Sequence, residues 1–311
     1  MSVEHELFPK PTEHNVVADM SLYRESLPAD NGKDLLWNEI ERAGDQNSRE
    51  MSAKKYVGKL EQLRLRAIEY RKTKGDTSED LILIDASYRA EMVKIWSITG
   101  RDPNKVNYMG LDVAVRWQQS VADYLYEVNK AHPRPYAHDK LKGFWESQKN
   151  IISYVSAPEK RSELSDLAEK YRNGILRAVA ARYVLESLDW RIHEPLSSKE
   201  DIEYQIDLRG QRNGRLTGLF QVKPTQNRDD PYELYFYNPE APRRPIDDAE
   251  AKFNQGVSHY IHDEHLDPHA VRGLLLRLSA RDQYLDRVTG RPQATYLATL
   301  GPAIEQEFNK H

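Results

Sequence analysis

The chain of 311 residues contains no cysteine. This absence excludes disulfide bonds, catalytic thiolates and zinc sites with cysteine ligands. The chain also lacks any run of 18 apolar residues, and its first residues do not show the basic and then apolar pattern of a signal peptide. We therefore expect no membrane contact and an intracellular location, cytoplasmic or, in a eukaryote, nuclear.

The chain also has no excess of positive charge. The formal net charge is −4, 30% of the residues are charged, and the mean hydropathy is −0.78. Because the whole protein is slightly acidic, any attraction to a phosphate backbone has to come from local basic patches. The length allows a substantial core and predicts two domains, or one large domain with an extension.

The N-terminal half is predicted to be helical after a polar arm. Residues 1–33 contain three prolines and no sustained period, whereas apolar residues recur at helical spacing in a predicted helical domain over 34–157. One predicted helix, residues 52–74, holds eight basic and two acidic residues. It is either a solvated helix face or a phosphate-contacting face. The candidate phosphate contacts there are Lys54, Lys55, Lys59 and Arg64.

The C-terminal part, residues 158–311, mixes helix and strand patterns. A helix is predicted over 161–187, and a first strand follows at 190–194. Two further β-rich runs lie at 202–208 and 216–223. The predicted order is therefore helix, strand, strand, strand.

A turn joins the last two predicted strands. It contains Asn213 and Gly214, which both tolerate positive φ and therefore favour a hairpin. Gln221 and Lys223 are two residues apart, so their side chains leave the same face of the strand. Asp207 lies near the end of the preceding run. If the strands pair, a carboxylate, an amide and an ammonium group converge at one end of a small sheet.

This order, with Asp207 followed by Gln221-Val222-Lys223, resembles the PD-(D/E)xK restriction-endonuclease-like superfamily. In that family a helix–strand–strand–strand core presents an aspartate and an acid-x-lysine pair at one end of a mixed sheet. Gln221 replaces the usual acid, a variant found in some members, including the endonuclease subunit of certain cut-and-paste transposases. The resemblance covers residues 161–265. It implies an α+β protein in which a helical N-terminal domain precedes a restriction-endonuclease-like core.

The resemblance also implies an activity. The chain would be a metal-dependent nuclease that hydrolyses phosphodiester bonds in nucleic acid, with DNA the expected substrate. Mg²⁺ or Mn²⁺ would bind Asp207, the amide oxygen of Gln221 and the backbone carbonyl of Val222, because these hard cations take oxygen ligands. Lys223 would orient the attacking water or stabilise developing negative charge. A homodimer or a partner protein of a larger complex is compatible with this function.

The family usually adds an acid on the helix before the first strand. The corresponding position falls near Arg177 and Ala178, neither of which is acidic. Glu169 and Glu186 are the alternatives, and we assign Glu186 as the catalytic acid because it lies closer to the strand. Basic residues in and beside the predicted hairpin are further candidate nucleic-acid contacts: Arg209, Arg212 and Arg215.

Other interpretations of the same residues stay open. Asp207 and Lys223 are also what a surface hairpin would carry as a strand-end acid and an edge-strand lysine. The nuclease fold with an inactive site would give a nucleic-acid-binding subunit. A third interpretation is a helical structural or interaction protein of a virus or mobile element, with the hairpin as an oligomer contact.

The remainder of the chain predicts a strand at 232–237, a helix at 247–265 and a final helix within 292–308. Residues 270–285 predict either a strand and then a helix, or one helix. Four histidines are spaced by three, three and four residues near the end of the 247–265 helix. A zinc site on one helix needs ligands at i and i+4, so solvated side chains are favoured over metal ligands. These histidines are His259, His262, His265 and His269.

Overall fold

The computed structural model describes residues 118–119, 121–123, 125–139, 141–142, 145, 161–193, 200, 203–227, 229–237 and 244–308. They belong to two compact units, one with residues 138–170 and one with residues 118–137 and 171–308. The predicted arm and most of the predicted helical domain lie outside the described residues. The same holds for the four candidate phosphate contacts Lys54, Lys55, Lys59 and Arg64.

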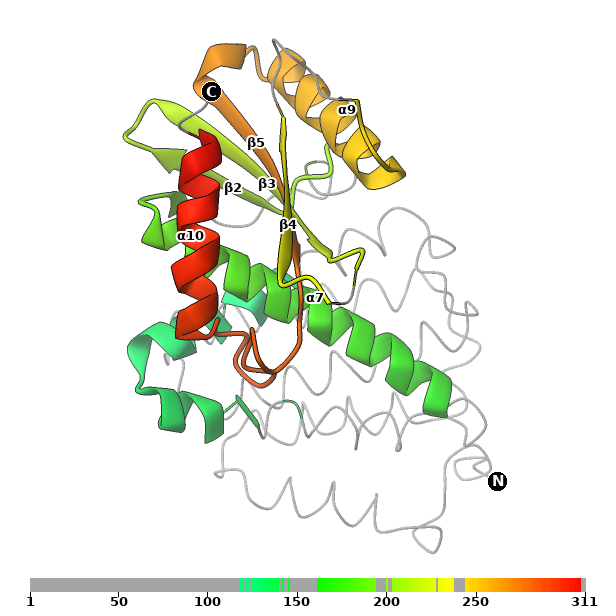
Figure 1. Ribbon diagram of the computed structural model, residues 1–311, viewed down its shortest axis with the longest axis vertical. Coiled ribbons are helices and arrows are strands. Elements are labelled where there is room, and N and C mark those ends of the chain that lie inside the picture. Colours follow the sequence, from blue (N-terminus) through cyan, green and yellow to red (C-terminus); the bar gives the residue numbers. More distant parts are fainter. Residues whose placement is uncertain are drawn as a thin grey trace, which may run out of the picture. The chain divides into compact units, whose positions relative to one another are not determined.

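The second unit is built on a mixed five-stranded sheet in the order β1-β2-β3-β5-β4 (Figure 1). Strands β3 and β5 are parallel, and the other neighbouring pairs are antiparallel. Helices accompany this sheet, so the α+β expectation is confirmed for this unit. The strands are β1 (Arg191–Ile192), β2 (Leu208–Arg212), β3 (Leu216–Pro224), β4 (Tyr232–Tyr237) and β5 (Val271–Leu278).

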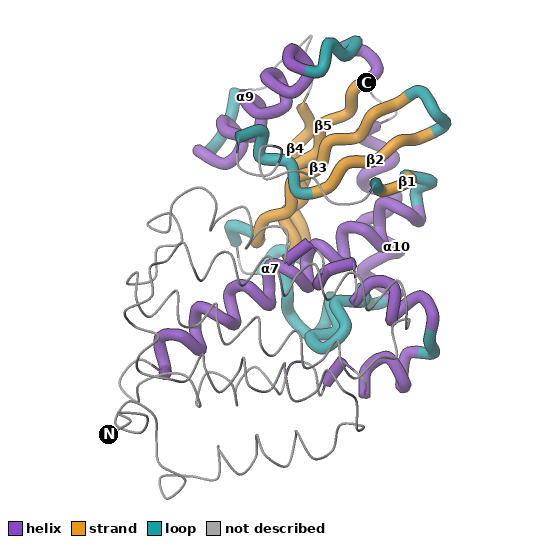
Figure 2. Tube along the Cα trace, turned by 180° about the vertical axis from the view of Figure 1, so that it is seen from behind, coloured by secondary structure: helices purple, strands orange, loops and turns teal. Residues whose placement is uncertain are grey.

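Helices cover both faces of the sheet (Figure 2). They are α7 (Arg161–Ser187), α9 (Asp248–Asp263), the short 3₁₀ helix η4 (Pro268–Ala270) and α10 (Ala294–Phe308). Helix α9 packs on one face, while the C-terminal half of α7 and α10 pack on the other. Within the described ranges, no helix is long and apolar enough to span a membrane.

Two apolar clusters fill the space between these layers. Phe220 lies in the cluster under α7 and α10, whereas its neighbour Leu219 lies in the cluster under α9. This is the alternation that a strand imposes on successive side chains. The α9 face of β3 therefore carries Leu219, Gln221 and Lys223, which places the two polar residues at the end of an otherwise buried row.

The predicted hairpin is confirmed. Strands β2 and β3 pair from Leu208 opposite Phe220 to Arg212 opposite Leu216. Asn213 and Gly214 have φ values of 53° and 63° in the turn, as the residue types predict. The predicted helix over 161–187 is also confirmed as α7.

The prediction of a strand over 202–208 is wrong for most of that run. Strand β2 begins only at Leu208, and residues 203–207 form turns and bends. Gln205 has a φ of 57°, which an extended strand does not allow and which costs a non-glycine residue about 1–3 kcal/mol. Tyr204 and Ile206 are buried against α9, so packing on a helix produces the alternating pattern. Asp207 therefore lies directly before a strand instead of near the end of one.

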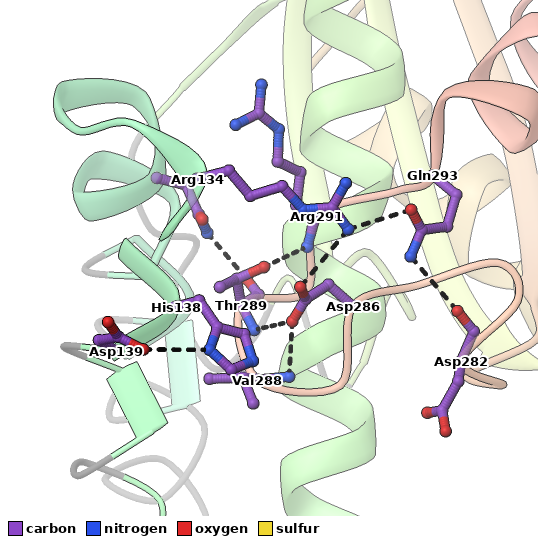
Figure 3. A network of polar contacts seen from close by, with 10 residues as sticks. Arg134, His138, Asp139, Asp282, Asp286, Val288, Thr289, Arg291 and Gln293 are labelled. Carbon is purple, nitrogen blue, oxygen red and sulfur yellow. Dashed lines mark hydrogen bonds and ion pairs between the residues drawn. The ribbon is translucent and has the colours of Figure 1, made fainter. Parts of the chain in front are cut away.

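The segment after β5 consists of turns and not of a helix, which corrects that part of the 270–285 prediction. The carboxylate of Asp286 accepts hydrogen bonds from the amides of Val288 and Thr289, at 2.9 and 3.0 Å (Figure 3). Arg134 donates to Gln293 at 3.0 Å, and the buried Asn129 donates to the carbonyl of Thr289 at 2.8 Å. These bonds connect the turns to residues 118–137 and set the start of α10.

One glycine sets the distance between α9 and the segment before β2. A Cβ atom on Gly256 would lie 2.0 Å from the carbonyl oxygen of Tyr204. Real Cβ contacts are never this short, so the helix can approach the backbone of residues 203–207 only because this residue is glycine.

Gly256→Ala is therefore expected to destabilise the protein, by about 1–3 kcal/mol if the helix shifts to relieve the overlap. Gly174→Ala in α7 is the matched control, because its Cβ would meet nothing within 4 Å. That change should stabilise by up to about 1 kcal/mol through helix propensity alone. Urea denaturation of both variants measures the difference, and equal effects of the two substitutions would contradict the close approach.

Candidate metal and catalytic site

The site begins where the pairing of β2 with β3 ends. The amide of Asp207 donates to the carbonyl of Phe220 at 2.8 Å, one residue before β2. The Oδ2 atom of Asp207 then accepts a hydrogen bond from the amide of Val222 at 2.6 Å. The carboxylate thus takes the place of the next backbone partner and is held beside the last residues of β3.

The Gln221 side chain lies on the α9 face of β3 and is 1% exposed. Its Nε2 atom donates to Oε1 of Gln205 at 3.1 Å. Its Oε1 atom is buried and has no hydrogen-bond partner among the described residues. An unsatisfied buried acceptor costs about 1–3 kcal/mol, so this oxygen is the atom that a ligand would satisfy.

Burial raises the pKa of the Asp207 carboxyl above its ordinary value. The positive charge of Lys223 and the hydrogen bond from the Val222 amide act in the opposite direction without overcoming it. The ionised carboxylate is therefore held in a desolvated position, in which a bound cation would stabilise it.

The backbone of Val222 supplies a further oxygen. The N–H and C=O of one strand residue point to the same side, and the N–H of Val222 points to Asp207. Since the pairing with β2 ends at Leu208 and Phe220, the carbonyl of Val222 extends beyond the ladder on that side. Three kinds of oxygen therefore belong to adjacent positions at this end of the sheet: the carboxylate of Asp207, the side-chain amide of Gln221 and the backbone carbonyl of Val222. Oxygen ligands of these kinds suit Mg²⁺ or Mn²⁺.

Lys223 is half-buried next to this oxygen set. It forms no hydrogen bond or ion pair with any residue in the described part of the chain. The neighbouring Arg277 in β5 is different, because its 7% exposed side chain lies 2.5 Å from Asp247 and 3.6 Å from Glu233. Arg277 is therefore neutralised by carboxylates, whereas the positive charge of Lys223 acts on Asp207 without a direct ion pair to any residue in the described ranges.

Asp247 links this arrangement to the start of α9. It caps the helix by accepting a hydrogen bond from the amide of Glu250 at 2.9 Å, and Glu250 accepts in turn from the amide of Ile246 at 2.7 Å. Desolvation would raise the pKa of Asp247, but the Glu250 amide and Arg277 together hold it below its ordinary value. Asp247 is therefore ionised at neutral pH and holds α9 against the end of β5.

Glu186, assigned above as the catalytic acid, has other partners. Its carboxylate accepts hydrogen bonds from the Tyr126 hydroxyl and, at 2.8 Å, from Arg182 Nε, and it lies 3.7 Å from Lys130. These contacts hold the Glu186 side chain against the helical residues 125–131. None of its contacts is with Asp207, so its catalytic role stays a prediction that its contacts do not favour.

The three candidate arginines of the hairpin do not form one basic surface. Arg209 donates to Tyr260 at 2.9 Å and to Glu200 at 3.0 Å on the α9 face. Arg212 lies 2.8 Å from Glu305 of α10 on the opposite face. Arg215 is exposed in the turn. Two of the three positive charges are thus matched by carboxylates.

The four histidines are exposed, as expected of solvated side chains. In the described ranges, no three or more histidine, aspartate or glutamate side chains are grouped so as to hold a metal ion. A cation at the candidate site would therefore depend on the single carboxylate of Asp207.

Two residues of the site were missed by sequence reasoning. Gln205 bonds to Gln221, and Arg277 pairs with Asp247 beside Lys223. Gln205 lies two residues before Asp207 in the sequence, and this spacing was the available indication that it could belong to the site. Nothing local indicated Arg277, because its partners come from a helix and a strand far from it in sequence.

Comparison with protein-family models gives no match, and neither the curated proteins nor the solved structures contain a similar chain.

The raised pKa of Asp207 predicts that Asp207→Asn stabilises the protein at pH 7. The pKa of this carboxyl is higher in the folded chain than in the unfolded chain. Such a group lowers the free energy of unfolding once the pH rises above its pKa in the unfolded chain, which is about 4. Asparagine removes this charge and keeps an oxygen for the Val222 amide. The gain should disappear as the pH falls below about 4, because the wild-type carboxyl is then protonated in both states.

Urea denaturation at pH 7 and at low pH measures this difference. Asp282→Asn is the control, because that carboxyl is 81% exposed and its neutralisation should change stability by less than about 0.5 kcal/mol. A destabilised Asp207→Asn variant at pH 7 would show that the carboxylate serves the fold alone.

Proposed function

We propose that this protein is a metal-dependent nuclease that hydrolyses phosphodiester bonds in nucleic acid, with DNA as the substrate. One observation carries the proposal: the buried, unpartnered oxygen of Gln221 lies on β3 beside a desolvated Asp207 and two residues before Lys223. A surface hairpin would need neither an unsatisfied amide oxygen nor a carboxylate whose pKa is raised by desolvation. A cation site would use both.

The order of elements supports the same proposal. The chain forms helix α7, then strands β1 to β3 of a mixed sheet, and later a further helix. This is the order of the restriction-endonuclease-like core that the sequence resembles. Asp207 and the Gln221-Val222-Lys223 run lie at one end of the paired strands. Strand β4 precedes α9 in this chain and adds an outer edge beside β5.

The residues fit hydrolysis of a phosphodiester. Asp207, Gln221 and Val222 would hold Mg²⁺ or Mn²⁺, which would polarise a phosphoryl oxygen and lower the pKa of a bound water. Lys223 would stabilise the negative charge that develops on the phosphoryl group. We propose Lys223 as the catalytic ammonium and Asp207 as the main ligand, and we place the protein inside the cell, where such a substrate occurs.

A second candidate function is nucleic-acid binding without cleavage. The observation that favours it is the low charge of the site, with one carboxylate and no helix acid in contact with it. A single carboxylate binds a divalent cation less tightly than two do. In this case the same fold would serve as a binding or assembly subunit.

Incubation of the full chain with supercoiled plasmid and Mn²⁺ tests the first candidate. Nicking or linearisation is expected, and Asp207→Ala or Lys223→Ala should reduce the rate by about 100-fold or more, the usual effect of losing a catalytic group. Asp282→Asn should cut like the wild type.

Cutting that survives both substitutions would refute the site assignment. Salt-dependent DNA binding by a wild-type protein that cuts with neither Mg²⁺ nor Mn²⁺ would support the second candidate instead.

A further inference from the structure

Gln205 has a defined place next to the candidate site although it belongs to neither strand. The segment around it is held from several directions. Ile206 donates its amide to the carbonyl of Glu200 at 2.9 Å, and the Tyr204 ring packs edge-on against Tyr260 with ring centroids 5.4 Å apart. Gly256 lets α9 contact the Tyr204 carbonyl directly. This packing holds Gln205 in the left-handed region, at a φ of 57°.

The side chain of Gln205 faces the amide of Gln221. A carboxamide has a donor end and an acceptor end, and the Oε1 atom of Gln205 accepts from the Nε2 atom of Gln221 at 3.1 Å. With the nitrogen engaged, the oxygen of Gln221 is turned away from Gln205. This oxygen is the buried atom without a partner.

We propose that Gln205 is a positioning residue that orients the Gln221 carboxamide so that its oxygen can bind a divalent cation together with Asp207. The inference rests on the proposed function, because it assigns a role in the same metal site. Partners that orient a metal ligand typically contribute 10–100-fold to metal affinity. A role at the site would also explain the strained backbone of Gln205, because such conformations cluster at functional sites.

Two substitutions at this position separate orientation from folding. Gln205→Gly removes the acceptor, and glycine adopts a φ of 57° without strain, so the fold should be at least as stable as the wild type. Gln205→Glu keeps an oxygen acceptor and cannot donate when ionised. It should therefore preserve the orientation of Gln221. Gln221→Leu removes the ligand itself and gives the reference for its loss.

The measurement is the affinity of the full-length protein for Mn²⁺ alone, from the electron paramagnetic resonance signal of the free ion. Gln205→Gly should bind Mn²⁺ about 10–100-fold more weakly than the wild type, with an unchanged or higher melting temperature. Gln205→Glu should bind at least as tightly as the wild type. Gln221→Leu should lose at least as much affinity as Gln205→Gly.

Nuclear magnetic resonance of the side-chain amides gives a readout that needs no metal. The NH₂ signals of Gln221 can be assigned by their loss in Gln221→Leu. In Gln205→Glu they should remain those of a hydrogen-bonded amide. In Gln205→Gly they should shift, because the hydrogen-bond acceptor is gone. Unchanged signals in Gln205→Gly would overturn the inference.

The failure of the inference can be told from the failure of the proposed function. Wild-type Mn²⁺ binding that is lost in Asp207→Ala but kept in Gln205→Gly would overturn only the role of Gln205. A wild-type protein that binds no Mn²⁺, or that binds it equally well with Asp207→Ala, would overturn the metal site and the inference with it.

Discussion

The parallel pairing of β3 with β5 is the constraint on which the described unit depends. Two parallel strands cannot be joined by a hairpin, so the chain between them has to cross over the sheet. Helix α9 is part of this connection, which also adds β4 on the far side of β5. The helix covers the face of β3 that carries Gln221. Gly256 lets this helix approach Tyr204, in the segment that leads to Asp207 and β2.

Two polar groups near the end of β3 lower the stability of the protein. Burial raises the pKa of Asp207, and the amide oxygen of Gln221 has no hydrogen-bond partner within the described ranges. A purely structural role explains part of this, because the Asp207 carboxylate satisfies the amide of Val222 at the end of the ladder. It does not explain the Gln221 oxygen. An aliphatic residue there would remove the cost, so the presence of an amide at this position favours a role in binding.

The amide of Gln221 in place of a second carboxylate, together with the paired arginines, would limit the affinity of the proposed site for cations and phosphate. With one carboxylate, cation affinity depends strongly on how well the other oxygens are oriented, which is why the contact between Gln205 and Gln221 matters. Arg209 and Arg212 are each paired with a glutamate. Phosphate binding by this unit would therefore depend on the half-buried Lys223 and on exposed residues such as Arg215, and not on a continuous basic hairpin.

Several features of this unit arise from local chemistry and can be predicted without the structure. The extent of α7, the turn at Asn213-Gly214 and the shared face of Gln221 and Lys223 follow from side-chain periodicity and from residues that tolerate positive φ. The start of β2 could not be predicted, because the alternating residues before it are buried by α9 and do not pair with a strand. The partners of the charged groups could be identified only from the three-dimensional structure. Glu186 bonds to Tyr126 and Arg182, and Arg277 pairs with Asp247, because long-range packing sets which side chains meet. The local pattern thus identified the carboxylate, the amide and the ammonium group, and long-range contacts with Val222 and Gln205 hold the first two in place.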